Sequence, residues 1–204
     1  MSSFERLEGS IRIGDEGLTF NDKKLPFTLH DFWTWSFSNI LSNATRGVLA
    51  EFIVATATGI NIKNVREEWK PNDLETPDHI TLEIKSAAYL QTWFQKRLSN
   101  ISFSTKPTFF WDSSNNEYGK EKKRHAKVYV FCLLHHTDKT TVNPLNLNQW
   151  NFYVVATKKL NEYSPNQNSI SLKALEKLTK AISYAELNAT IKSVIELDNR
   201  NSQQ

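Results

Sequence analysis

The stretch Ile80-Thr81-Leu82-Glu83-Ile84-Lys85 decides the fold, because apolar and polar residues alternate along it. Side chains of a β-strand point alternately to its two faces, so the apolar residues share one face and Thr81, Glu83 and Lys85 share the other. A carboxylate and an ammonium group on one face can serve one site, in which the carboxylate holds a divalent metal and the lysine orients water or neutralises charge on a phosphate. The alternative is a half-buried strand whose polar face is solvated and salt-bridged.

The residues before this strand predict a β-hairpin that carries a second carboxylate. Residues 69–75 are followed by Thr76-Pro77-Asp78-His79, a sequence rich in residues that favour tight turns. A three-residue loop would place Asp73 opposite Glu83, whereas a two-residue loop would place them on opposite faces, and the sequence leaves this register open. Two carboxylates from adjacent strands are a common arrangement for binding Mg²⁺.

An upstream segment predicts a helix with a glutamate on its apolar side. Asn43 is the expected N-cap of a helix over residues 45–58, and Gly59 is the expected stop. Glu51 stands among small and apolar residues at helical spacing. Burying its carboxylate would be costly unless it meets a metal ion, a lysine or hydrogen-bond donors. The alternative is that Glu51 lies at the edge of the apolar face and reaches water.

Glu51 on a helix, Asp73 on a hairpin and the sequence Glu83-Ile84-Lys85 together resemble the PD-(D/E)xK nuclease superfamily, which includes restriction enzymes, repair nucleases and resolvases. The resemblance covers roughly residues 30 to 160. More narrowly, a group of uncharacterised bacterial proteins is similar to the chain over residues 46–52, 66–69, 73–74 and 83–91.

This resemblance implies an α/β fold, a restriction-endonuclease-like mixed β-sheet flanked by α-helices. It also implies hydrolysis of phosphodiester bonds in DNA with Mg²⁺, for which Mn²⁺ can substitute. By position, Asp73, Glu83 and the backbone carbonyl of Ile84 would bind the metal. Lys85 would orient the attacking water or stabilise the transition state, and Glu51 would support the site or a second metal.

Two further residues follow from the resemblance. Asp78 comes directly after a proline, as in the superfamily's Pro-Asp pair, but it lies where the turn is expected. Asp73 is therefore the preferred metal ligand, and Asp78 is the alternative. Gln91 resembles a glutamine that lies near the substrate in some branches of the superfamily.

The densest basic run predicts a flexible loop that contacts phosphate groups of a nucleic acid. Its basic residues are Lys120, Lys122, Lys123 and Arg124. Contacts to phosphate supply salt-dependent affinity without reading sequence. An ordinary solvated loop is the alternative, because the net charge of +3 does not by itself argue for a nucleic-acid partner.

Composition and length favour one globular domain over residues 1–204 in the cytoplasm. A chain of 204 residues is long enough to bury a core. The lone Cys132 indicates a reducing compartment, the start of the chain lacks a hydrophobic signal core, and no apolar run is long enough to span a membrane.

Within this domain we expect residues 1–28 to be irregular with a short strand at 11–13, and residues 198–204 to form a disordered tail. His30 or Asp31 is the expected cap of a helix that ends near Leu41, and its aromatic side chains are expected in the core or at an interface, with a base-stacking platform as the alternative. The remaining predicted elements are strands at 64–69, 101–104, 128–134 and 150–156, and helices at 172–178 and 184–196.

The leading functional hypothesis is a Mg²⁺-dependent DNA endonuclease in restriction, phage defence or repair. The alternative is a catalytically inactive module that keeps the nuclease fold for nucleic-acid binding or complex assembly. A homodimer would provide two sites related by a two-fold axis for cutting both strands, although the residues identify no interface.

Overall fold

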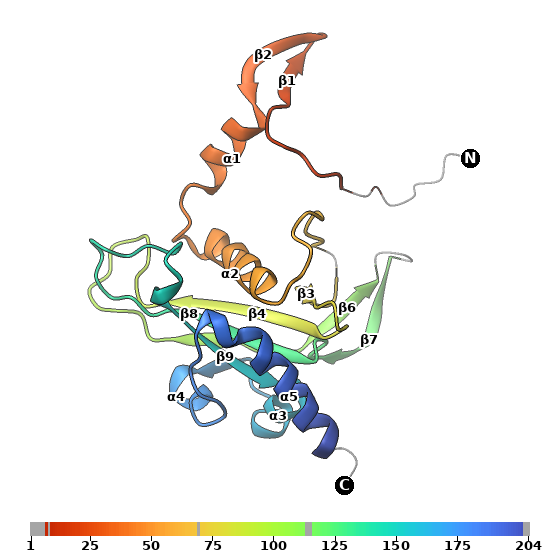
Figure 1. Ribbon diagram of the computed structural model, residues 1–204, viewed down its shortest axis with the longest axis vertical. Helices are drawn as coiled ribbons and strands as arrows, with labels where there is room; N and C mark the ends of the chain where they lie inside the picture. Colours follow the sequence, from red (N-terminus) through yellow and green to blue (C-terminus); the bar gives the residue numbers. More distant parts are fainter. Residues whose placement is uncertain (1–6, 8, 69, 113–115, 202–204) are drawn as a thin grey trace.

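The computed structural model describes residues 7, 9–68, 70–112 and 116–201, and its centre is a four-stranded sheet (Figure 1). The strand order is β3 (Leu74–Glu75), β4 (Thr81–Ala88), β8 (Val128–Leu134) and β9 (Trp150–Ala156). β4 and β8 run parallel, whereas β3 pairs with β4 and β9 pairs with β8 in antiparallel fashion. A mixed sheet flanked by helices confirms the predicted α/β class.

One face of the sheet packs against two long helices, α2 (Asn43–Ala57) and α5 (Leu187–Asn201). The apolar side chains that alternate along β4 point to this face, as the sequence predicts. Fully buried residues from five elements meet there, among them Val54, Leu82, Val130, Phe152 and Ile191. Burial of this apolar area, at roughly 25 cal/mol per Å², is the main force that holds both helices on the sheet.

The opposite face of the sheet is covered over only part of its length. The ribbon of β5 (Ser102–Ser104) and β10 (Ser169–Ser171) and the short helices α3 (Thr157–Tyr163) and α4 (Leu172–Leu175) cover the apolar part. Near the start of β4 the same face carries Glu83 and Lys85. A separate hairpin, β6 (Thr108–Asp112) and β7 (Glu117–Lys123), lies beside this polar part, close to β3 (Figure 1).

An N-terminal hairpin and helix extend away from the sheet (Figure 1). They are β1 (Gly17–Phe20), β2 (Lys23–Thr28) and α1 (Leu29–Phe37). The prediction of an irregular segment with a strand at 11–13 is wrong. Asn21 and Asp22 form the two-residue turn with φ of +48° and +58°, and an Asn-Asp pair is a hairpin signal that the sequence analysis overlooked.

The aromatic helix α1 begins and ends earlier than predicted. Its N-cap is Thr28, whose hydroxyl accepts from the Asp31 N–H, while the Asp31 carboxylate accepts from the Thr28 N–H (2.7 Å). The helix ends at Phe37, and none of its residues is buried. The prediction that its aromatic side chains lie in the core is therefore wrong, and an interface or a base-stacking platform remains as the interpretation.

Other boundaries differ from the predictions for local reasons. The N-cap of α2 is Ser42 instead of Asn43, while Gly59 with φ of +73° follows its end as predicted. Residues 64–68 form turns and coil instead of a strand, and Trp69 lies outside the described residues. The end of α5 occupies residues 198–201 of the predicted disordered tail, and residues 202–204 lie outside the description.

Two predicted helices also differ, and short 3₁₀ turns complete the described fold. α4 ends at Leu175 instead of residue 178. Residues Tyr184–Glu186 are a 3₁₀ turn with a Ser183–Glu186 capping box, and Leu147–Gln149 form another. Within the described parts of the chain, no helix has both the length and the apolar character needed to cross a membrane.

Candidate active site

The loop of the β3–β4 hairpin decides which carboxylates meet. It has three residues, 77–79, because the Thr76 N–H donates to the Ile80 carbonyl at 3.0 Å and the next two residue pairs continue this register. Continued by one residue pair beyond β3, this register brings Asp73 opposite Glu83. It is the first of the two arrangements that the sequence left open.

Asp73 and the polar face of β4 form a compact charged group. Asp73 Oδ2 accepts a hydrogen bond from the Ile84 N–H (2.7 Å), and Lys85 Nζ lies 2.5 Å from Glu83 Oε1. Burial raises the pKa of Glu83, and the charge of Asp73 raises it further, while Lys85 acts in the opposite direction. Burial works to lower the pKa of Lys85, but Glu83 and Asp73 outweigh it and the pKa is raised. Lys85 is therefore protonated at neutral pH.

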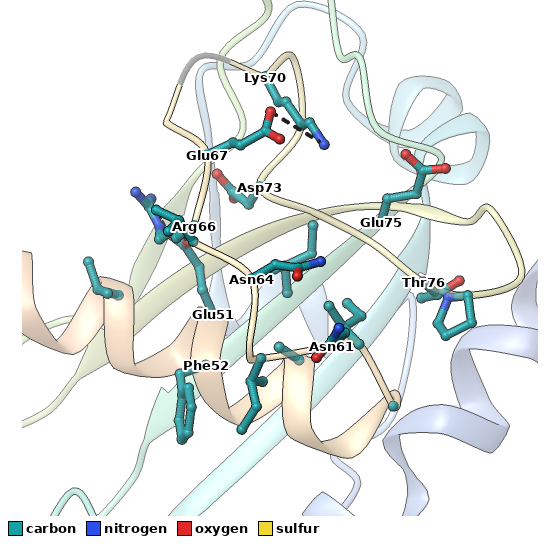
Figure 2. Close-up of a pocket in the computed structure, with 18 of the residues that line it drawn as sticks. Glu51, Phe52, Asn61, Asn64, Arg66, Glu67, Lys70, Asp73, Glu75 and Thr76 are labelled. Carbon is teal, nitrogen blue, oxygen red and sulfur yellow. Dashed lines mark hydrogen bonds and ion pairs between the residues drawn. The ribbon is translucent and has the colours of Figure 1, made fainter. Parts of the chain in front are cut away.

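The buried Glu51 has a partner that sequence reasoning missed. Arg66, in the loop after α2, donates from Nε to Glu51 Oε2 (2.5 Å) and from Nη2 to Oε1 (2.9 Å). The hydrogen bond with Glu51 raises the pKa of Arg66, burial opposes this, and the charge of Asp73 adds to it. Figure 2 shows Arg66 beside the carboxylates of Glu51 and Asp73. A bidentate pair offsets the cost of burying Glu51, so the alternative that Glu51 simply reaches water does not hold.

Two cavities meet at Asp73. The larger, of about 610 Å³, lies between α2 and the loop that follows it, and its lining includes Glu51 and Arg66 (Figure 2). The smaller, of about 230 Å³, is lined by Asp73 and Glu83 together with aromatic rings of β6. The two carboxylates therefore border open space and are not enclosed in the core.

The chemistry of Asp73 and Glu83 fits a magnesium ion. The described residues contain no group of three or more His, Cys, Asp or Glu side chains that could hold a metal ion. Mg²⁺ does not need such a group, because it binds through one or two carboxylates and keeps several waters. The two facing carboxylates, with the backbone of Ile84 beside them, provide oxygen ligands. A divalent cation would also relieve the repulsion from Asp73 that raises the pKa of Glu83.

Two other residues near the carboxylates were missed. His125 lines the smaller cavity, and its Nε2 atom lies 2.8 Å from the Thr108 carbonyl oxygen. Tyr129 pairs in register with Glu83, and burial together with the Glu83 charge raises the pKa of its hydroxyl. His125 is the last residue of the basic run over residues 120–125, so the sequence held a weak signal for it. Tyr129 stands in an apolar run, and that run gave no signal that the residue lies near the site.

Asp78 and Gln91 lie apart from the carboxylates. The Asp78 carboxylate is in the hairpin loop, with Oδ2 2.7 Å from Lys192 Nζ of α5. Gln91 donates from Nε2 to the Ala88 carbonyl (2.9 Å) just beyond the end of β4. That end is about 17 Å from Glu83 along the strand, at 3.3–3.4 Å per residue. The geometry thus favours Asp73 over Asp78 as the partner of Glu83.

The lysines of the basic run are exposed, but they belong to a strand. Lys120, Lys122 and Lys123 are in β7, so the prediction of a flexible loop is wrong. The segment is a regular strand because it pairs with β6. Lys122 Nζ lies 5.0 Å from the centre of the Phe109 ring. Phe109 also lines the smaller cavity, so the basic hairpin forms one wall of the candidate site.

Arg124 is buried, and the prediction that it binds nucleic acid is wrong. Its guanidinium group donates to four acceptors that join separate loops, namely Thr105 O, Asn161 Oδ1, Ser164 O and Gln167 O. These bonds occupy every nitrogen of the group. Arg124 therefore stabilises the fold and does not face a phosphate.

We predict that Arg124→Ala destabilises the fold and that Lys122→Ala does not. Arg124→Ala should lower the free energy of unfolding by about 3 kcal/mol, because it leaves buried carbonyl groups without a hydrogen-bond donor. Lys122→Ala should leave it within about 0.5 kcal/mol, since its side chain is exposed. Urea unfolding measures both. Unchanged stability in Arg124→Ala would contradict the structural role.

The fold and site define an α/β protein whose paired carboxylates and lysine suit hydrolytic chemistry. The sequence profile of bacteriophage T4 endonuclease IV matches residues 30–174, which include every residue of the candidate site. The chain therefore belongs to the bacteriophage T4 endonuclease IV family, and the family identifies it as a nuclease with DNA as the indicated substrate. Searches of curated proteins and of solved structures give no significant match.

Proposed function

We propose that the protein is a Mg²⁺-dependent endodeoxyribonuclease of the PD-(D/E)xK type, for which Mn²⁺ can substitute. The observation that carries the proposal is the hairpin register, because it brings Asp73 opposite Glu83 with Lys85 on the same strand face. The restriction-endonuclease-like form of the fold belongs to this proposal. So does a role in restriction, phage defence or repair, since each needs an enzyme that cuts DNA.

Each site residue has a distinct task in this proposal. Asp73, Glu83 and the Ile84 carbonyl would hold a divalent ion, which when bound supplies positive charge that polarises the phosphodiester and activates a water. Protonated Lys85 donates a hydrogen bond to the attacking water or to a phosphate oxygen, where negative charge develops. Glu51 fixes Arg66 beside Asp73 and so supports the site from α2.

The β6–β7 hairpin provides the proposed path for DNA. Exposed Lys120, Lys122 and Lys123 would contact backbone phosphates next to the smaller cavity. Such contacts orient the duplex without reading its sequence and weaken as salt is raised. The phosphodiester would then reach Asp73 and Glu83 through the smaller cavity.

We expect Lys85→Ala to slow cleavage about 100-fold or more, because it removes the cation nearest to the developing charge. Supercoiled plasmid and phage DNA, incubated with Mg²⁺, Mn²⁺ or EDTA, would report nicking and linearisation. Lys192→Ala is the matched control, since it removes an exposed lysine that pairs with Asp78. Cleavage that persists in EDTA would contradict the metal requirement. Mg²⁺ titration by calorimetry should show that Lys85→Ala still binds the ion.

A further inference from the structure

The N-terminal arm, defined as β1, β2 and α1, exposes an unusual amount of apolar surface. Its large apolar side chains with at least 39% of their area exposed are Leu18, Phe20, Leu25, Phe27, Phe32, Trp35 and Phe37. Trp35 is the extreme, with 83% exposed. The family match begins at residue 30, so the hairpin lies outside it, whereas α1 from residue 30 onward lies inside it.

The apolar side chains of the hairpin are exposed. Phe20 pairs directly with Lys23 and Thr19 pairs with Lys24, so Phe20 and Thr19 point to opposite faces. The pairing then shifts, and Leu25 and Phe27 lie in the irregular part of β2 between Lys24 and Thr28. Phe20, Leu25 and Phe27 are each at least 39% exposed, so the described parts of the chain leave them largely uncovered.

Such an arm needs a partner to be stable. A two-stranded hairpin and a nine-residue helix are each marginal in water without packing. A half-exposed aromatic side chain offers roughly 100 Å² to a partner, so the five aromatic residues offer on the order of 500 Å². With the aliphatic side chains this approaches the roughly 800 Å² per partner of a stable protein interface.

The charge of the arm favours a protein as that partner. From residue 17 to residue 37 the sequence has two basic and two acidic side chains, not counting His30. Nucleic acids and anionic membranes bind surfaces with an excess of positive charge. An apolar surface without that excess is suited to another protein surface.

The same chain carries an apolar surface that could receive the arm. Val48, Phe52, Ile62 and Val65 are 41–51% exposed, and all four line the larger cavity. Figure 2 shows Glu51 between Phe52 and Asp73, so Phe52 lies on the far side of Glu51 from Asp73. One copy thus presents both a protruding apolar arm and an apolar hollow.

We propose that the arm of one copy packs into the apolar end of the larger cavity of a second copy, and that the exchange is reciprocal. A contact in which each copy gives an arm and receives one closes about a two-fold axis, so it forms a dimer and does not propagate into a filament. The exchange leaves the Asp73 end of both cavities open. It does not depend on the cleavage reaction, so its tests are separate from those of the proposed function.

The first test is the mass of the full chain in solution. Sedimentation equilibrium at micromolar concentration should give a dimer, and Phe20→Asp should raise its dissociation constant at least 100-fold. Thr19→Asp is the matched control, since Thr19 pairs with Lys24 on the other face of the hairpin and should leave the dimer unchanged. A monomeric wild type, or a dimeric Phe20→Asp, would overturn the proposal. A cooperative thermal unfolding transition in both variants shows that the core remains folded.

The second test locates the receiving surface. Trp35→Cys and Phe52→Cys chains are mixed, allowed to exchange and treated with a short bis-maleimide. The native Cys132 is fully buried and does not compete. Covalent dimers should form in the mixture and in neither variant alone. Cross-linking of Trp35→Cys by itself would mean that two arms meet each other, and a dimer without cross-links in the mixture would also overturn the proposed contact.

Discussion

Glu83→Gln and Asp73→Asn are each expected to reduce metal-dependent DNA cleavage by about 1000-fold or more. Both changes keep the size of the side chain and remove its charge, so one of the two carboxylate ligands is lost. A 1000-fold loss corresponds to about 4 kcal/mol of transition-state stabilisation, a magnitude within what a bound metal supplies as a Lewis acid. Initial rates of plasmid nicking measure the effect. Calorimetry should show weaker Mg²⁺ binding in both variants.

Asp78→Asn is the control that separates the two candidate aspartates. Asp78 and its partner Lys192 are both about half exposed, and an exposed ion pair contributes only about 0–1 kcal/mol. Cleavage and Mg²⁺ affinity should therefore remain close to wild type. If Asp78→Asn abolished cleavage while Asp73→Asn did not, the assignment would be reversed. If the folded double variant Asp73→Ala Glu83→Ala still cut DNA, the proposed site would be refuted.

The central residues of the candidate site could be predicted from the sequence, because local sequence patterns determine where they lie. Alternation from residue 80 to residue 85 fixes which side chains share a face, and Pro77 and Asp78 mark the turn. Only the loop length was undetermined, and a change of one residue would have moved Asp73 to the other face. The hydrogen bond from Thr76 to Ile80 resolves that choice.

Hydrogen-bond partners that are distant in the chain could not be predicted from local patterns. Arg124 stands in a run of basic residues and looks solvated, yet its acceptors come from segments as far as 43 residues away. Arg66 is 15 residues from Glu51, and nothing in their spacing reveals the pair. The aromatic residues of α1 illustrate the converse, because composition indicates burial but none of the residues of α1 is buried by the described parts of the chain.

Arg66→Ala is expected to lower the free energy of unfolding by about 2–3 kcal/mol, because it leaves the Glu51 carboxylate buried without its partner. Fully buried pairs lose about 3–5 kcal/mol in this way, and the smaller figure follows from the 38% exposure of the Arg66 side chain. Urea unfolding would measure the loss. Glu68→Gln is the control, since Glu68 contacts the same guanidinium group at 3.4 Å but is 74% exposed, and its removal should cost less than about 0.5 kcal/mol.

Combining Arg66→Ala with Glu51→Gln distinguishes a supporting role for Glu51 from a role in binding metal. The double variant should recover at least about 1 kcal/mol relative to Arg66→Ala, because a neutral amide is less costly to bury than an unpaired carboxylate. If Glu51 acts through Arg66, the double variant should cleave DNA no more slowly than Arg66→Ala alone. A further tenfold loss of cleavage with weaker Mg²⁺ binding would instead mean that Glu51 contacts a metal directly. The cycle thus tests whether α2 supports the β-hairpin site through an arginine or completes it with a third carboxylate.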